Sequence, residues 1–257
     1  MFSFDQHTIA QVLAAALLGG LIGLDRTALG QFMISQPVVA APVTGWVLGD
    51  LNAGLIIGGV LELIWVMDLP VGTFVPADST ATAISATAIA AIGGRGSAEP
   101  WMIGFCLLLT TIMVPVTMAA DHLMRTRNAS IPEHALGGRG RPTEGSITRW
   151  HLAGLLAFFL KSFLLCLGLI AAGVAALRLF ERAPEVAHRA AVLFLLLLPF
   201  LGAASMMRRL SIRNLDRTLL TGFAIGLICT QLLKLPALAI LPLAAVGGWL
   251  MVKHHGT

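Results

Sequence analysis

Four carboxylates occupy a long stretch of this sequence that contains no basic residue. Between residues 27 and 94 the chain carries Asp50, Glu62, Asp68 and Asp78 but no Lys, Arg or His. An ionised carboxylate in the middle of a bilayer costs roughly 3 kcal/mol or more unless water, a proton or a polar ligand satisfies it. Sugar hydroxyls donate hydrogen bonds that carboxylates accept. The pattern therefore favours a cation, a proton or a neutral polyol as ligand, and an anionic substrate fits it poorly.

The four acids differ in their surroundings. Glu62 lies in the apolar run GGVLELIW, with no basic residue nearby, which favours a functional role over a merely protonated buried carboxyl. Asp78 lies in PADST, where it could cap a following helix and still face a cavity. Asp50, in GDLN, has the sequence of a turn or helix cap. Asp68 precedes Pro70, and its position leaves an interfacial and a functional role equally open.

A second rank of polar residues could contribute to the same site. Asp25 ends the first apolar run, and Gln31 and Gln36 flank a break in the next one. Their side chains could contact sugar hydroxyls or cap backbone groups. Lys161 and Lys234 lie inside apolar runs, where reaching toward the membrane surface is the default, although either could pair with a buried acid.

Composition excludes several classes of protein. Of 257 residues, 57% are hydrophobic and 12% are charged, whereas about 25% are charged in a soluble domain. A net charge of +4 is too small for a nucleic-acid-binding face. No Walker, G-x-S-x-G, H-E-x-x-H or dinucleotide motif occurs, and no histidine lies between residues 37 and 94. We expect no cofactor, no metal and no catalytic residue, and the three cysteines, all in apolar runs, are expected to be buried filler.

Hydropathy predicts an all-α polytopic integral membrane protein. A membrane helix needs ~20 apolar residues, and six runs approach that length: 8–24, 101–120, 151–179, 190–207, 218–233 and 235–252. Three shorter segments, 38–49, 53–67 and 80–94, are interrupted by Pro and Gly. Broken segments of this kind are typical of re-entrant or discontinuous helices that line a cavity. We therefore predict roughly six full spans plus re-entrant helices between residues 37 and 94.

The basic residues predict the topology. Arginines concentrate in the hydrophilic segment 121–150 and again at 206–217, so both are predicted to be cytoplasmic. The N-terminus is then outside and the C-terminus inside, with the arginines between 178 and 189 as an exception. Three parts follow: an N-terminal membrane half (1–120), a cytoplasmic loop (121–150) and a C-terminal membrane half (151–257). The hexapeptide LDRTAL at 24–29 is echoed by LDRTLL at 215–220, and chance explains this match better than an inverted repeat.

Several motifs together resemble a known family. They are GLIGLD at 20–25, QPVVA at 36–40, GWVLGD at 45–50, GLIIGGVLEL at 54–63 and PAD at 76–78. The chain resembles the IIC component of the mannose–sorbose family of the bacterial phosphotransferase system, densely between about residues 20 and 90. Gln36 departs from the Arg common in the family, and the loop around 137–142 has no family match.

The resemblance implies a sugar-conducting subunit of the bacterial cytoplasmic (inner) membrane. It implies a IID membrane partner, soluble IIA and IIB phosphotransfer proteins, a hetero-oligomer with several IIC and IID chains, and a hexose of the mannose, fructose, sorbose or amino-sugar class. The sugar would be phosphorylated on entry by IIB. The family's buried carboxylates correspond to Glu62 and Asp78, with Asp25, Gln31, Gln36 and Asp68 as further candidates. Two alternatives remain: an ion-coupled secondary transporter of a neutral polar solute, and a non-transporting sensor or scaffold subunit.

Overall fold

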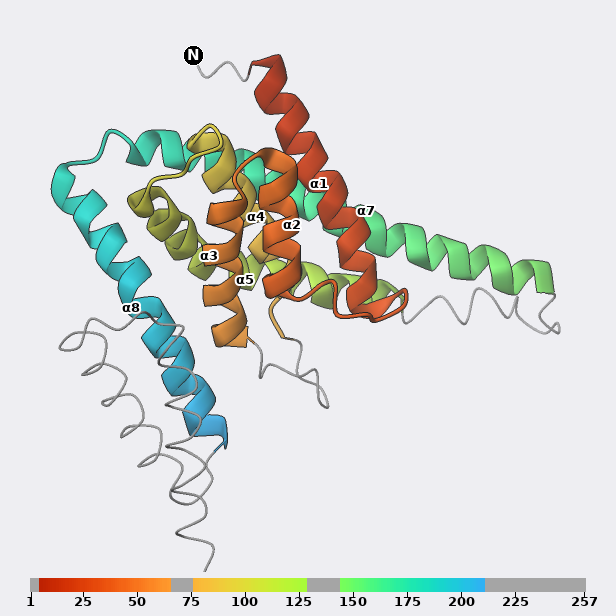
Figure 1. Ribbon diagram of the computed structural model, residues 1–257. Helices are drawn as coiled ribbons and strands as arrows, with labels where there is room; N and C mark the ends of the chain where they lie inside the picture. The colour runs from red at the N-terminus through yellow and green to blue at the C-terminus, as the bar shows by residue number, and fades with distance from the viewer. Residues whose placement is uncertain (1–4, 66–75, 129–143, 211–257) are drawn as a thin grey trace, which may run out of the picture. The chain divides into compact units, whose positions relative to one another are not determined.

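The described part of the chain is helical. The computed structural model describes residues 5–65, 76–128 and 144–210, and the regular structure in these ranges consists of seven α-helices (Figure 1). They are α1 (Gln6–Thr27), α2 (Pro37–Leu48), α3 (Leu51–Trp65), α4 (Ser79–Gly93), α5 (Pro100–Asn128), α7 (Glu144–Phe180) and α8 (Glu185–Leu210). The chain divides into two compact units, residues 1–202 and 203–257, and the contacts described below lie within the first.

Four of these helices are long and apolar enough to cross a membrane. They are α1, α5, α7 and α8, each with an apolar segment of at least 22 residues. The prediction of an all-α membrane protein is thereby confirmed, and these helices coincide with the predicted spans 8–24, 101–120, 151–179 and 190–207. The predicted total of six spans is not confirmed, because 218–233 and 235–252 lie outside the described residues.

The long helices extend beyond their apolar cores. Helix α5 continues to Asn128, and α7 already begins at Glu144, so the hydrophilic segment 121–150 is helical at both ends. Helix α1 begins at a cap: the Oδ1 atom of Asp5 accepts from the backbone N–H of Thr8 at 2.9 Å. This hydrogen bond lowers the pKa of the Asp5 carboxyl, which precedes the first span.

The three helices between residues 37 and 94 are short. Helix α2 has 12 residues, and α3 and α4 have 15 each. At 1.5 Å per residue they reach only about 18 to 23 Å, which is less than the ~30 Å of hydrocarbon. Their bounds match the three interrupted segments of the sequence to within two residues.

Helices α2 and α3 form a tight hairpin. Gly49 ends α2 in the left-handed conformation, with φ at 86°. Asp50 then caps α3, since its Oδ1 atom accepts from Ala53 N at 3.0 Å and its Oδ2 atom accepts from Ala98 N at 2.7 Å. A Cβ on Gly54 would lie 2.6 Å from the carbonyl oxygen of Ala41, so the absent side chain lets the two helices touch. Asp50 therefore serves the structure, as its turn sequence indicated.

Helix α4 forms the centre of the first unit. Every residue from Thr80 to Ile92 is buried, and α4 contacts α1, α2, α3, α5 and α7. Its Ala, Ser and Thr side chains are small enough for helices to approach on all sides, which is the packing typical of membrane bundles. The N-terminus of this surrounded helix is where the polar residues converge.

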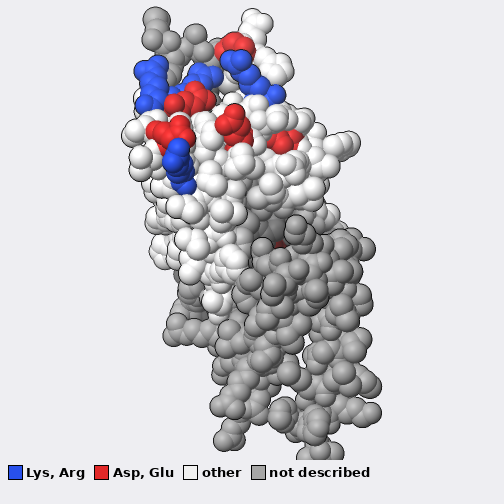
Figure 2. All heavy atoms as spheres, turned by 60° about the vertical axis from the view of Figure 1, so that its left-hand side comes forward, with Lys and Arg blue, Asp and Glu red and all other residues white. Residues whose placement is uncertain are grey.

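The outer surface of the bundle is apolar. Helices α1 and α7 pack side by side, and they expose leucines such as Leu13, Leu17, Leu156 and Leu164 away from one another. Figure 2 shows charged side chains gathered toward one end of the face in view and a wide uncharged surface beside them. This distribution suits a helix bundle whose sides lie in lipid.

Candidate functional site

Asp78 organises the N-terminus of α4. It is the N-cap residue, and its Oδ1 atom accepts from Ala81 N at 3.0 Å. Its backbone N–H donates to Oγ1 of Thr117 on α5 at 3.2 Å, and its carbonyl oxygen accepts from Oγ1 of Thr82 at 2.8 Å. With 2% of its side chain exposed, Asp78 is held by neighbours on every side.

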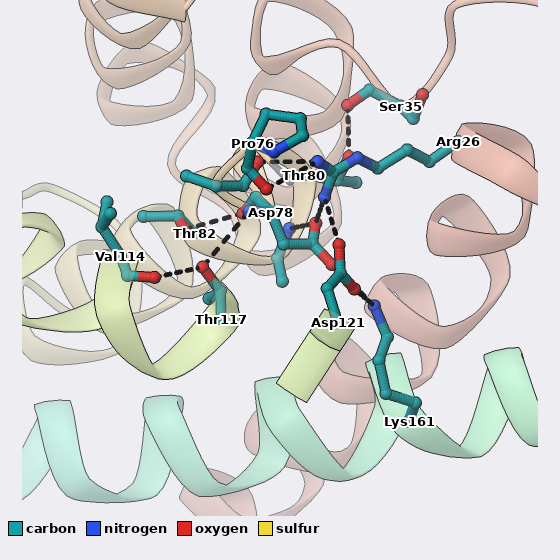
Figure 3. A network of polar contacts seen from close by, with 12 residues as sticks. Arg26, Ser35, Pro76, Asp78, Thr80, Thr82, Val114, Thr117, Asp121 and Lys161 are labelled. Carbon is teal, nitrogen blue, oxygen red and sulfur yellow. Dashed lines mark hydrogen bonds and ion pairs between the residues drawn. The ribbon is translucent and has the colours of Figure 1, made fainter. Parts of the chain in front are cut away.

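Asp78 also belongs to a buried ion cluster, which consists of Arg26, Asp78, Asp121 and Lys161 (Figure 3). The Nζ atom of Lys161 donates to Oδ2 of Asp78 at 2.8 Å and to Oδ1 of Asp121 at 2.7 Å. The Nη1 atom of Arg26 lies 2.9 Å from Oδ1 of Asp78 and 3.4 Å from Oδ2 of Asp121. Two cations and two carboxylates thus neutralise one another between α1, α5, α7 and the start of α4.

Arg26 joins the ion cluster to the backbone before α4. Its Nη2 atom donates to the carbonyl oxygen of Ala77 at 2.7 Å and lies 3.4 Å from that of Pro76. The guanidinium therefore uses both terminal nitrogens. Breaking a buried ion pair by removing one partner leaves an uncompensated charge, so the cluster is a rigid base for the segment 76–80.

A second set of hydrogen bonds holds the loop between α1 and α2. Asp25 is buried at the end of α1, and its oxygens accept from the backbone N–H groups of Phe32 at 2.7 Å and Ser35 at 3.0 Å. The carbonyl oxygen of Ser35 accepts from Oγ1 of Thr80 at 2.7 Å. The loop includes Gln31 at a φ of 54°. Asp25 thus shapes the loop and fixes it to α4.

The loop and the start of α4 enclose a cavity of about 270 Å³. The residues that line it come from the end of α1 with its following loop, the end of α3, the segment 76–80 and the end of α5. They are Asp25, Arg26, Thr27, Gln31, Met33, Ser35, Gln36, Trp65, Pro76, Ala77, Ser79, Thr80 and Arg125. The lining is mostly polar, with one aromatic ring, so it can form hydrogen bonds with a small polar solute.

The structure brings some of the predicted site residues together. Asp25, Gln31 and Gln36 line the cavity. Asp78 does not line it but lies behind its wall, between the lining residues Ala77 and Ser79. Asp68 lies outside the described residues.

Glu62 lies apart from the ion cluster. It is half-buried on α3, one turn before the cavity-lining Trp65, and its Oε2 atom accepts from Val38 N at 3.2 Å. Because Pro37 is the first residue of α2, this bond satisfies one of the free N–H groups at the start of that helix. Glu62 therefore ties the end of α3 to the start of α2 beside the cavity.

The sequence analysis did not single out three residues of this region. Arg26, Asp121 and Arg125 are charged groups at the ends of long apolar helices, where they were counted only toward topology. For Lys161 a pair with an acid was one of two alternatives, and the structure shows that pair; Lys234 lies outside the described residues. One signal was available, because charges of both signs occur near the ends of three separate predicted spans.

Other chemistry is not evident in the described ranges. They contain no group of three or more His, Cys, Asp or Glu side chains placed to hold a metal ion. Cys106 and Cys166 are free and buried.

Comparison with known proteins agrees with the resemblance noted in the sequence. The model of the family described as "PTS system sorbose-specific iic component" matches residues 9–252. The mannose-specific EIIC component of Escherichia coli (strain K12) is 28% identical over 120 residues, which is 45% of this chain and 45% of that protein. The putative N-acetylgalactosamine permease IIC component 2 of the same strain is 34% identical over 87 residues, 34% of this chain and 65% of that one. The matches thus span less than two thirds of these relatives.

Two solved structures share the fold. One, described as "Structure of membrane protein", has a TM-score of 0.63 at 21% identity and covers 98% of this chain and 97% of that one. The other belongs to the complex of the mannose transporter ManYZ with microcin E492, with a TM-score of 0.53 at 19% identity and the same coverage. At these identities the likeness concerns the fold.

Proposed function

The chain belongs to the sorbose-specific IIC component family of the phosphotransferase system, and from this premise we propose that it binds and conducts a hexose that is phosphorylated on entry. The family is one of multi-pass membrane sugar permeases of the mannose class. The particular sugar, the site and the partners of this chain are the content of the proposal.

The observation that carries the proposal is the polar cavity at the start of α4. Gln31 and Gln36 reach it from the loop, and each amide can donate to one sugar hydroxyl and accept from another. The Ser79 hydroxyl adds a third such group. The Trp65 ring offers an apolar surface for the C–H face of a pyranose, which is how aromatic rings and a few polar groups combine in small-molecule sites.

Asp78 and Glu62 support this site in different ways. We assign Asp78 to positioning, because its carboxylate already binds Arg26 and Lys161 and caps α4. Glu62 uses one oxygen for Val38 N, and its second oxygen, at the edge of the cavity, is available to a sugar hydroxyl. Asp68 stays a candidate contact.

The partners follow from the absence of a phosphoryl donor in the motifs of the sequence. A IIB protein would bring the phosphoryl group on a histidine, a IIA protein would recharge it from phosphoenolpyruvate, and a IID chain would complete the membrane complex. The basic segments 121–150 and 208–217 are proposed as the cytoplasmic docking surfaces. Their charge would attract an acidic protein surface.

The ion cluster favours one rival function. Buried carboxylates inside a membrane bundle are also the mark of proton or Na⁺ coupling, so an ion-coupled transporter of a neutral solute is the second candidate. In that case Asp78 and Asp121 would exchange their cationic partners for the coupling ion. The solute would reach the cytoplasm unmodified.

The chemical form of the accumulated solute tests the proposal. Membranes with this chain and its IID candidate would receive a panel of radiolabelled hexoses, with and without phosphoenolpyruvate and the soluble phosphotransfer proteins. We expect sugar phosphate only when phosphoenolpyruvate is present. Unmodified sugar that accumulates with a proton or Na⁺ gradient would show the rival function instead.

A further inference from the structure

We propose that Arg125 forms a phosphoryl-binding subsite at the edge of the cavity, where it holds the phosphoryl group as it passes to the sugar. The inference rests on the proposed function and adds to it a residue that contacts the group being transferred. It starts from the one lining residue whose charge the hydrogen bonds of the cavity do not use.

Arg125 is an exposed cation on the cavity lining. It lies in the last turn of α5. Within the described part of the chain, its guanidinium has no hydrogen-bond or ion-pair partner. A guanidinium without a partner that faces a polar cavity can receive an anionic ligand without breaking an existing bond.

The acids near Arg125 are already engaged. Asp121 lies one helical turn before it, where an i, i+4 pair would form, but its Oδ1 atom accepts from Lys161 at 2.7 Å and its Oδ2 atom lies 3.4 Å from Arg26. The oxygens of Asp25, the acid that lines the cavity, accept from the backbone N–H groups of the loop. The positive charge of Arg125 therefore lacks a bonded counter-charge.

The second cation at the cavity is fixed. Both terminal nitrogens of Arg26 are used, one toward the carboxylates of the ion cluster and one toward the carbonyl oxygen of Ala77. Arg26 can add to the local potential but cannot turn to a ligand without giving up these contacts. Arg125 is the group that can form two parallel N–H···O bonds with a phosphoryl group.

A neutral hexose gives a reason for an anion subsite only once it is phosphorylated. In the transfer, a sugar hydroxyl oxygen forms the new bond to phosphorus while the bond from phosphorus to the histidine nitrogen of the soluble partner breaks. The electron pair of that bond returns to the histidine nitrogen, which takes the hydroxyl proton. Arg125 would balance the charge on the phosphoryl oxygens during this step, where one such donor is worth about 10² to 10³ in rate.

The position of Arg125 suits this role. It belongs to the segment 121–150, which the positive-inside pattern places in the cytoplasm. The phosphorylated partner approaches from that side. A simple dipole contact at the end of α5, or docking of the partner onto exposed arginines, would explain Arg125 without any role in the cavity, and both are outcomes of the test.

The first measurement is binding without the soluble proteins. Membranes with the IIC and IID chains bind a radiolabelled hexose, and unlabelled hexose phosphates or unlabelled hexose compete. We expect Arg125→Gln to weaken competition by the hexose phosphates at least tenfold and competition by the hexose less than twofold. Arg182→Gln, which removes an exposed charge at the turn between α7 and α8, is the matched control and should change neither.

The second measurement is sugar phosphorylation at saturating soluble partner. We expect Arg125→Gln to lower kcat about 100-fold with the KM for the sugar within twofold, and Arg125→Lys to recover part of the rate because it restores charge but not the planar pair of donors. If Arg125→Gln instead raises only the KM for the phosphorylated partner, as Arg127→Gln would for a docking surface, the subsite is disproved.

Unchanged competition by hexose phosphates would also disprove the subsite while leaving the sugar permease intact. A wild-type complex that neither binds nor phosphorylates any hexose would instead contradict the proposed function itself, and the subsite with it.

Discussion

Two cations and two carboxylates meet behind the cavity wall, although they come from four separate segments of the chain. The charges of the ion cluster balance, and each oxygen of Asp78 and Asp121 lies within 3.4 Å of a cationic nitrogen. Its main consequence for function is indirect. It holds Arg26, and through Arg26 the backbone of 76–77, in a single arrangement next to the sugar.

The balance of the ion cluster predicts a compensating pair of substitutions. Lys161→Met leaves two carboxylates facing one cation, so we expect a loss of about 3 kcal/mol in stability, as for other broken buried pairs. Lys161→Met combined with Asp121→Asn leaves one ion pair and should recover most of that loss. Thermal denaturation of the detergent-purified complex measures both. A double variant no more stable than the single one would contradict the account of the ion cluster.

Glu62 can be divided into a structural and a ligand-binding part. Glu62→Gln keeps an oxygen that can accept from Val38 N, whereas Glu62→Ala removes it. We expect Glu62→Gln to preserve thermal stability but raise the KM for the sugar about tenfold, since a hydrogen bond to a charged group is worth about 1.5 to 3 kcal/mol. Glu62→Ala should lower stability as well. Normal sugar phosphorylation in Glu62→Gln would leave Glu62 with its structural role alone.

Sequence reasoning reached some of these residues and not others. The burial of Asp78 and its cap on α4 followed from local sequence, because a cap depends on residues within one turn. The ion cluster could not be predicted in the same way, since Lys161 lies 83 residues from Asp78 and 40 from Asp121. Only the packing of α7 against α4 and α5 brings these charges together.

At the scale of the elements, the short helices α2 and α3 depend on small residues at their contact. Pro and Gly positions predicted the short segments, because they interrupt the apolar runs that longer helices require. The direction of each contact was not predictable, since a glycine in an apolar run can face a neighbouring helix, as Gly54 does, or open space, as Gly59 does.

These two glycines provide a matched test of the hairpin. A Cβ at Gly54 would lie 2.6 Å from the Ala41 carbonyl oxygen and 2.9 Å from Cα of Pro42, so Gly54→Ala must push two backbones apart. We expect a loss of about 1 to 3 kcal/mol. Gly59→Ala meets nothing within 4 Å and should be neutral or stabilise by up to about 1 kcal/mol. Thermal midpoints in detergent distinguish them, and equal effects would argue against the close contact of α2 and α3.

At the scale of the whole molecule, the sequence predicted an all-α membrane protein and its family from hydropathy and from the motifs between residues 20 and 90. Orientation remains a prediction, because the described helices fix which ends share a side but not which side is the cytoplasm. The end of α5 and the start of α7 are joined by the segment 129–143, whereas the turn between α7 and α8 follows the far end of α7.

Labelling of single cysteines tests this orientation. In a variant with Cys229→Ser, the described native cysteines are buried. We expect a membrane-impermeant thiol reagent added to intact cells to label Arg182→Cys and not Arg127→Cys, with the reverse in inverted vesicles. The opposite pattern would place the cavity's arginines outside the cell and contradict cytoplasmic release of the sugar.

The central claim is that the sugar occupies the cavity at the start of α4, and Gln36 tests it most directly. Gln36 is the N-cap residue of α2 but its side chain forms no cap hydrogen bond, so Gln36→Ala removes an amide from the lining at little cost to the helix. Gln11→Ala, near the other end of α1, is the control. The measurement is equilibrium binding of the radiolabelled hexose that the wild-type complex phosphorylates. We predict that Gln36→Ala raises its Kd about 3- to 10-fold and Gln11→Ala does not; equal affinity in both variants would show that the sugar binds elsewhere.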